Sequence, residues 1–266
     1  MRGGQVSATR MFAPIETATP GLVALVAVSL AIAGVVKGGI GVGMPVVALP
    51  LLSTLVDVQT AVMLLSVPLV LSNIPQALEG GHVPQTLWSL APVLVGMVPG
   101  VWIGVAVLLN VDPAVAKIAA GAGVMLAAAL TLLAPNLQIQ RRLVGPVGFC
   151  AGLCGGLLGG MAALSGPLVF IFLLAKGLRG SAFTKEASMF LVVSSVLLAS
   201  ALTSSHRFDW RDVLISTLAT APVVAGTLVG QKVRDAVPAE VFKKLVVLMV
   251  LVSGAQLIWS GVSCGV

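Results

Sequence analysis

Charged residues are scarce in this sequence. Asp, Glu, Lys and Arg together make up 9% of its 266 residues, whereas a soluble domain carries about 25%. So few charged side chains cannot cover the surface of a water-soluble globule of this size. The composition therefore excludes a cytosolic enzyme, a disordered chain and a nucleic-acid-binding protein. The net charge of +6 is better explained by membrane topology than by a phosphate-binding surface.

Cysteine, histidine and buried acidic groups are also scarce. The three cysteines are too few for a disulfide framework. Cys150 and Cys154 share a helical face, but no His, Asp or Cys nearby completes a metal site. A membrane-embedded enzyme would need a nucleophile–base pair or a metal group, and the two histidines, His82 and His206, fall in loops. We therefore disfavour an enzyme and expect no metal and no cofactor.

Apolar sequence is what the chain has in abundance. Apolar residues make up 58% of the chain, and a membrane-spanning helix needs about 20 of them in succession. These runs are continuous rather than alternating, which excludes a β-barrel and predicts an all-α integral membrane protein with about eight to ten membrane helices. The charge-free runs are Thr17–Val36, Gly38–Val56, Val58–Leu78, Val83–Val111, Ile118–Gln140, Leu143–Ala175, Ala187–Ser205, Val213–Gln231 and Leu245–Val266.

One of these runs is too long for a single span. Leu143–Ala175 has 33 residues, which would make a helix about 50 Å long. Two segments rich in glycine and proline interrupt it, Gly155–Gly160 and Ser165–Pro167. We expect a broken or hairpin-like pair of helices here. Non-helical backbone at membrane depth is tolerated only where protein or a watery cavity satisfies it.

The sequence also repeats itself. Pro45 and Pro167 are each preceded, at seven and eleven residues, by glycines in a Gly-x-x-x-Gly pattern. A second match relates Ala91–Gly100 to Ala221–Gly230, each built on Ala-Pro-Val followed by spaced glycines. The sequence therefore predicts two copies of one unit.

The predicted organisation is an N-terminal extension at 1–16 and two repeats at 17–140 and 141–266, each with a broken-helix pair followed by three transmembrane helices. If each pair enters and leaves on one side of the membrane, the second repeat is inverted. This arrangement divides the cations nine against five, compared with eight against six if each pair crosses once, and the positive-inside rule favours the larger imbalance. Both termini are then outside the cytoplasm. Paired interruptions in inverted repeats indicate a secondary transporter with a site near the midplane.

The segments that carry this pattern resemble a known family. Gly38–Pro45 reads Gly-Gly-Ile-Gly-Val-Gly-Met-Pro, and Gly159–Pro167 reads Gly-Gly-Met-Ala-Ala-Leu-Ser-Gly-Pro. Together with Lys185–Ser188, they are similar to the sulfite exporter TauE/SafE family of membrane permeases. The resemblance covers nearly the whole chain. It implies a four-plus-four or five-plus-five helix transporter of sulfite, sulfonates or related anions, without a cofactor. Lys37 departs from the glycine-richer versions of the first motif.

We predict a substrate site on the two interrupted segments, because backbone N–H groups beside glycines can approach an oxyanion closely. The alternative is that the glycines allow tight helix packing of the small-xxx-small kind. A serine hydroxyl in the second segment adds a donor. The candidates are Gly38, Gly39, Gly41, Gly43, Pro45, Gly159, Gly160, Ser165, Gly166 and Pro167.

Polar side chains inside apolar runs are further candidates. Lys37 has about 20 apolar neighbours on each side, and a lysine within a membrane is a functional hypothesis by default. Its alternative is a side chain that extends to the interface. Asn73 and Gln76 share a helical face and would donate to the substrate, or bond between helices instead. Ser188 has the same two interpretations.

Lys185 and Glu186 open the run that follows the second interruption. Lys185 would attract the anion at the cytoplasmic mouth, and Glu186 would carry a proton. The alternative is an ion pair at the start of a helix.

These observations predict a secondary transporter (permease or exporter) in the cell inner (plasma) membrane. Its substrate would be a small sulfur-containing anion such as sulfite or an organosulfonate, moved by alternating access as the two repeats rock. A passive anion channel and a transporter of another small organic anion stay open as alternatives. The partners are the anionic substrate and the lipid bilayer, with no nucleic acid, and a homodimer is one option for assembly.

Overall fold

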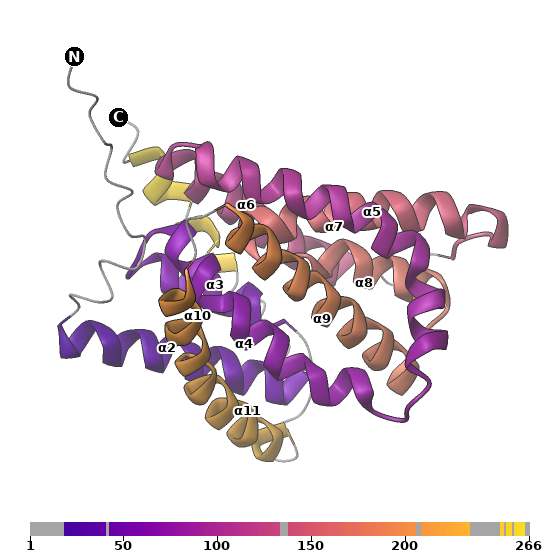
Figure 1. Cartoon of the computed structure of the whole chain (residues 1–266), viewed down its shortest axis with the longest axis horizontal. Coiled ribbons are helices and arrows are strands. Elements are labelled where there is room, and N and C mark those ends of the chain that lie inside the picture. The colour runs from indigo at the N-terminus through magenta and orange to yellow at the C-terminus, as the bar shows by residue number, and fades with distance from the viewer. Residues whose placement is uncertain are drawn as a thin grey trace.

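The protein is a bundle of α-helices, seen here in a computed structural model that describes residues 19–40, 43–133, 138–205, 209–234, 251–252, 254–256 and 258–263 (Figure 1). These residues include no strand. Six of their helical segments are long and apolar enough to cross a membrane, which confirms the prediction of an α-helical integral membrane protein with several spans. The segments are Pro20–Gly39, Val58–Leu78, Val83–Asn110, Arg141–Ala162, Gly180–Ser204 and Trp210–Lys232.

Prolines and one acidic cap set several helix starts. A proline lies in the first turn of α3, α5 and α8, where its missing N–H costs nothing. Asp57 caps α4 by accepting a hydrogen bond from the Thr60 amide at 2.7 Å. The elements in chain order are α2 (Pro20–Ile40), α3 (Met44–Ser53), α4 (Val58–Leu78), α5 (Val83–Asn110), α6 (Pro113–Leu133), the 3-10 helix η1 (Arg141–Leu143), α7 (Val144–Ala162), α8 (Gly166–Ala175), α9 (Gly180–Ser204), α10 (Trp210–Leu218) and α11 (Thr220–Arg234).

One expected span in the last third of the chain differs in the structure, and another is only partly described. The run Val213–Gln231 was expected to form one helix, but the helical geometry is interrupted at Ala219, between α10 and α11. Half of the final run, Leu245–Val266, lies outside the described residues, so its span stays a prediction.

Both predicted interruptions exist, within the predicted segments, but the first glycines of each segment continue the preceding helix. Helix α2 runs unbroken through Lys37 to Ile40, and the chain turns at Gly43, whose φ is +95°. Helix α7 runs through its glycines to Ala162, and the chain turns at Ala163, whose φ is +56°. A glycine within a helix costs only about 1 kcal/mol, which close packing readily offsets.

That close packing joins two pairs of helices. A Cβ at Gly38 would lie 2.2 Å from the Thr227 carbonyl oxygen of α11, and a Cβ at Gly160 would lie 2.4 Å from the Val101 carbonyl oxygen of α5. In both pairs the helix backbones therefore touch directly. In each pair, the first helix of one predicted repeat (α2 or α7) packs against a helix of the other repeat (α11 or α5). That second helix is the one that carries the Ala-Pro-Val segment. The repeat boundaries and the inverted relation of the copies stay predictions.

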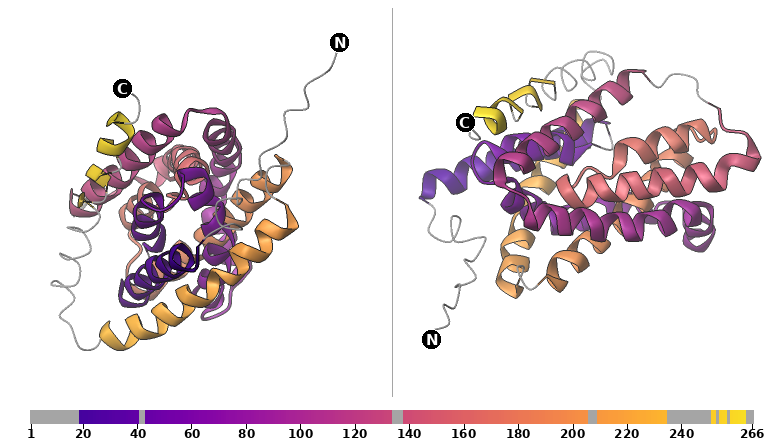
Figure 2. Two further views of the ribbon diagram at one scale, coloured as in Figure 1. Left: turned by 90° about the vertical axis from the view of Figure 1, so that its left-hand side faces the viewer. Right: turned by 90° about the horizontal axis from the view of Figure 1, so that it is seen from above.

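Helices α4 and α9 pack against each other in the middle of the bundle. Each has 56% of its span buried, compared with 33% for the Arg141–Ala162 and Trp210–Lys232 segments. The short helix α3 packs on α4, and its counterpart α8 packs on α9. The α5–α7 pair forms one flank of the bundle and the α10–α11 arm forms another (Figures 1 and 2). The two broken pairs thus lie on either side of a buried centre.

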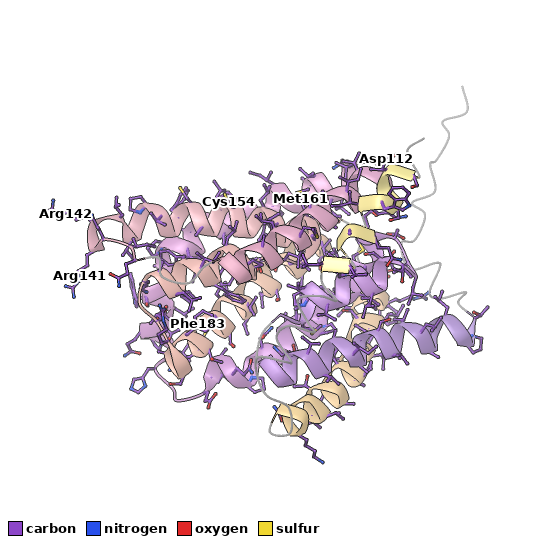
Figure 3. The ribbon with its side chains drawn as sticks, turned by 180° about the vertical axis from the view of Figure 1, so that it is seen from behind. Asp112, Arg141, Arg142, Cys154, Met161 and Phe183 are labelled. Carbon is purple, nitrogen blue, oxygen red and sulfur yellow. The ribbon has the colours of Figure 1, made fainter. Side chains whose placement is uncertain are left out.

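Charged side chains mark the two ends of the α5–α7 pair. Arg141 and Arg142 lie at one end and Asp112 at the other, and all three are exposed (Figure 3). The uncharged Cys154 and Met161 lie between them. This distribution is the one that a bilayer requires, because its hydrocarbon core excludes charge. The protein is therefore a multi-pass membrane protein.

Candidate functional site

Lys37 is buried inside the bundle, in the last turn of α2. Its side chain is 2% exposed, so it does not extend to the membrane interface. Its ammonium donates a hydrogen bond to Asn73 Oδ1 on α4 at 2.5 Å. Asn73 is itself 1% exposed, and its amide nitrogen donates to the Leu69 carbonyl at 2.7 Å. That second bond holds the amide with its oxygen turned toward Lys37.

Within the described residues, Asn73 is the one hydrogen-bond partner of the Lys37 ammonium, and no carboxylate lies within 4.0 Å of it. An ammonium has three donors, and a neutral amide satisfies one of them. A buried cation normally has an anionic partner, because its desolvation is costly. This part of the structure therefore holds one positive charge that its described protein neighbours do not balance.

The start of α3 lies beside the same turn of α4. Ser72, next to Asn73 in the chain, contacts the Met44 sulfur at 4.0 Å, and Met44 is the first residue of α3. Gly43 precedes it in the left-handed region, and nothing lies within 4 Å of the position that a Cβ would take there. The turn thus borders open space. Pro45 is in the first turn of α3, Gly39 is half-buried, and Gly41 lies outside the described residues.

A second polar contact joins α4 to α9. Ser188 is fully buried, and its hydroxyl donates to Gln76 Oε1 at 3.3 Å. Gln76 is three residues after Asn73, so both amides lie on adjacent turns of α4. Lys37, Asn73, Gln76 and Ser188, which we call the polar line, extend across α2, α4 and α9. The structure thus shows the interhelical bonds that the sequence left as an alternative, and substrate binding by these residues stays a prediction.

The second break is more tightly packed. Gly159 and Gly155 make room for the start of α8, because Cβ atoms there would lie 2.8 Å from Ser165 Cβ and 2.9 Å from its carbonyl oxygen. Ser165 is 4% exposed and makes no capping bond to α8. Gly166 and Pro167 form the first turn of that helix. No hydrogen bond in the described part of the chain joins this break to the polar line.

Gly38 and Gly160 contact other helices rather than a cavity. Their Cα atoms face carbonyl oxygens of α11 and α5, which is the packing role that the sequence left open. Sequence patterns do not distinguish the two roles, because a helix backbone and an anion both need a glycine in order to approach closely.

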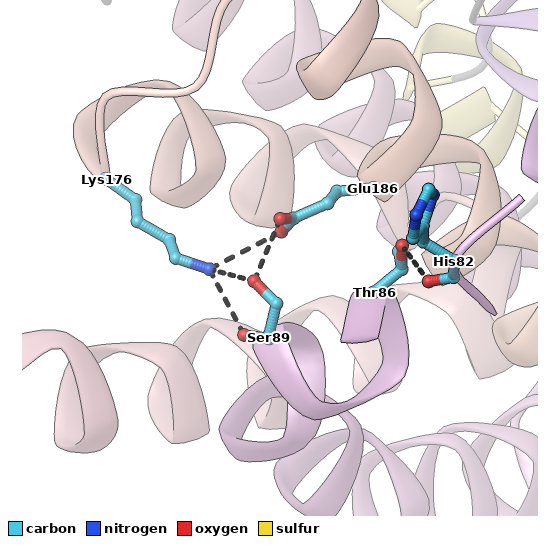
Figure 4. Close-up of polar contacts among 5 residues, drawn as sticks. All are labelled: His82, Thr86, Ser89, Lys176 and Glu186. Atoms are coloured by element: carbon cyan, nitrogen blue, oxygen red, sulfur yellow. Dashed lines mark hydrogen bonds and ion pairs between the residues drawn. The ribbon is translucent and has the colours of Figure 1, made fainter. Parts of the chain in front are cut away.

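A charged cluster lies near the start of α9, where Glu186 is in the second turn of the helix (Figure 4). Lys176, at the end of α8, contacts Glu186 at 3.4 Å and donates to Ser89 Oγ of α5 at 2.6 Å. Ser89 donates in turn to Glu186 at 2.8 Å. The structure therefore shows an ion pair at this helix start. The partner of Glu186 is Lys176, and Lys185 instead donates to the carbonyl oxygen of Gly81.

The sequence analysis missed Lys176 and Ser89 as partners in this cluster. Lys176 precedes Glu186 by ten residues across a turn, and Ser89 comes from a distant helix. Neither has the three- or four-residue spacing that reveals contacts along one helix.

A cavity of about 350 Å³ lies between α2 and the α10–α11 arm. Its lining is apolar and includes Leu30, Leu64 and Ile215. Such a lining offers no donor to an anion, so the cavity is not a candidate for the substrate site.

Comparison with known families agrees with this architecture. Residues 25–257 match the family described as "Sulfite exporter TauE/SafE". The chain matches no curated protein and no solved structure. The matched region includes both broken helix pairs, the polar line and the charged cluster at the start of α9. On this match over most of its length, the chain belongs to the sulfite exporter TauE/SafE family.

Proposed function

We propose that the protein is a secondary transporter of a small sulfur-containing anion, such as sulfite or an organosulfonate, in the plasma membrane. The observation that carries this proposal is Lys37, a buried ammonium at a helix break with one neutral partner, Asn73, among the described residues. A bound anion would supply the missing counter-charge. Family membership supports a transporter rather than an enzyme.

The proposed site is centred on the first break. Lys37 and Asn73 hold the anion, and backbone N–H groups at Gly43 and the start of α3 add donors, since the first amides of a helix have no partner within it. Gln76 is one turn away on α4. The second break contributes the hydroxyl of Ser165, whose burial leaves it inside the bundle.

The packing suggests which bodies move in alternating access. The backbone contacts of α2 with α11 and of α5 with α7 combine helices from both predicted repeats, so whole repeats cannot separate without breaking them. We therefore propose that these two pairs move against each other across α4 and α9. The Gln76–Ser188 bond at 3.3 Å lies on this α4–α9 contact and would break and reform in each cycle.

Counterflow in proteoliposomes tests the proposal. Vesicles preloaded with unlabelled sulfite should accumulate labelled sulfite transiently, because a carrier exchanges the two and a channel does not. Lys37→Gln should abolish this exchange. Lys232→Gln is the matched control, because it removes an exposed cation from α11 and should leave exchange unchanged.

Two results would contradict the proposal. Sulfite flux without trans-stimulation would indicate a channel. Full exchange by folded Lys37→Gln protein would show that Lys37 is not part of the substrate site.

A further inference from the structure

The net charge around Lys37 points to the charge of the substrate. Resting on the proposed function, we infer that the site accepts singly charged anions and rejects doubly charged ones, and that Lys37 sets this selectivity. The substrate class is therefore a monoanion such as a sulfonate or hydrogensulfite, rather than sulfate or thiosulfate.

The described neighbours of Lys37 add no further charge. Asn73 is its hydrogen-bond partner, and Ser72 and Met44 lie on the adjacent part of α4 and at the start of α3. Gln76 and Ser188 continue the polar line. All five side chains are neutral, so the ammonium is the one full charge that this part of the structure presents to a ligand.

The helix dipoles at the break oppose each other. The last turn of α2, which contains Lys37, carries a partial negative charge of about one half, and the start of α3 carries a partial positive charge of the same size. Both helix ends meet at this break. Their contributions offset each other, and the net charge stays close to that of the ammonium.

The charges of the cluster on α9 are committed elsewhere. The Glu186 carboxylate is bound by Lys176 and Ser89, and Lys185 donates to the carbonyl oxygen of Gly81. None of them belongs to the polar line. Within the described part of the polar line, a second substrate charge would therefore have no cation to pair with.

The charge of the occupied site follows from these contacts. A monoanion bound to Lys37 makes the site neutral, whereas a dianion leaves a buried negative charge. Burying an unpaired charge is strongly unfavourable in a low-dielectric interior. The site should therefore favour the monoanion even when both anions have similar size and oxygen geometry.

Competition by anions of fixed charge provides the test. Labelled methanesulfonate is exchanged in proteoliposomes against unlabelled methanesulfonate, ethanesulfonate, sulfate or ethane-1,2-disulfonate, none of which changes its charge near neutral pH. The two monoanions should compete at least about tenfold more strongly than the two dianions, because the dianions leave a net buried charge.

A gain of charge sharpens the test. Asn73→Lys adds a second cation beside Lys37 and should shift the preference toward the dianions by at least about tenfold. Asn73→Gln is its matched control, since it changes the length of the side chain without adding charge: it should lower the rate of exchange but keep the preference for monoanions in the exchange that remains. Size-exclusion profiles and thermal unfolding establish which variants fold. If Asn73→Lys does not fold, the competition measured with the wild-type protein decides the test.

The outcomes separate the two proposals. Equal competition by monoanions and dianions in a protein that exchanges methanesulfonate overturns the charge selectivity and keeps the transporter. Absence of exchange for every anion, sulfite included, overturns both. An Asn73→Lys variant that folds and exchanges with unchanged selectivity also overturns the role of the single charge.

Discussion

The two helix breaks occupy corresponding positions but turn at different residues, because Gly43 is left-handed in the first, whereas in the second Ala163 is left-handed and Ser165 keeps a helical backbone. When Pro45 is placed on Pro167, Lys37 corresponds to Gly159, and Gly43 corresponds to Ser165. In the second break the Ser165 side chain lies against Gly159, where a Cβ would come within 2.8 Å of it.

In the first break the side chain and the glycine have changed places between these two positions. The turn is made by Gly43 without a side chain and borders open space, and the side chain is the buried ammonium of Lys37. The two predicted copies therefore differ in what they bury at corresponding breaks. One break holds a buried ammonium beside open space, and the other is closely packed.

The largest expected effect comes from moving the charge to the second break. Gly159→Lys should reduce the free energy of unfolding by more than about 3 kcal/mol, because the new side chain overlaps Ser165 and buries an unpaired cation. Thermal unfolding in detergent measures it. Gly145→Lys, on the same helix with nothing within 4 Å of its Cβ position, should fold normally. Equal stability of the two variants would refute the described packing of the second break.

Removing the charge from the first break should have the opposite effect on stability. The double variant Lys37→Met with Asn73→Leu replaces a buried polar pair by apolar groups of similar volume, and such changes often stabilise by about 1 to 4 kcal/mol. We expect a higher thermal midpoint together with lost exchange. Ser195→Ala, at the position that corresponds to Asn73, should leave exchange intact. A destabilised double variant would show that Lys37 serves the fold.

The smallest effect concerns the backbone of the two turns. Ala163 holds φ at +56° and Gly43 at +95°, and a residue with a Cβ pays about 1 to 2 kcal/mol for such a conformation. Ala163→Gly should therefore stabilise the protein by less than about 1 kcal/mol, because glycine also loses more entropy on folding. Gly43→Ala should destabilise it by about 1 kcal/mol. Thermal unfolding of both variants checks the signs, and like signs would contradict the described turns.

Much of the fold was predictable because the membrane imposes simple rules. Low charge and continuous apolar runs predict helices, and the excessive length of Leu143–Ala175 predicts a break. Lys37, Asn73 and Gln76 were identifiable because polar groups are rare in such runs.

The neighbours of each helix were not predictable. The glycines of α2 and α7 face other helices, whereas the interruption at Ala219 does have a local signal, because Pro222 cannot bond to the Leu218 carbonyl and its ring crowds it. The Lys176–Glu186 ion pair depends on a turn whose course local periodicity does not reveal.

The contact between α2 and α11 has a consequence for biosynthesis. Helix α7 can pack against α5 soon after it is synthesised, because little sequence separates them. The glycine face of α2 can pack against α11 only after nearly the whole chain has been synthesised. Until then that face is covered by lipid. The N-terminal helix, although first to emerge from the ribosome, is therefore among the last to reach its final place, and a chain truncated before α11 leaves it without its partner.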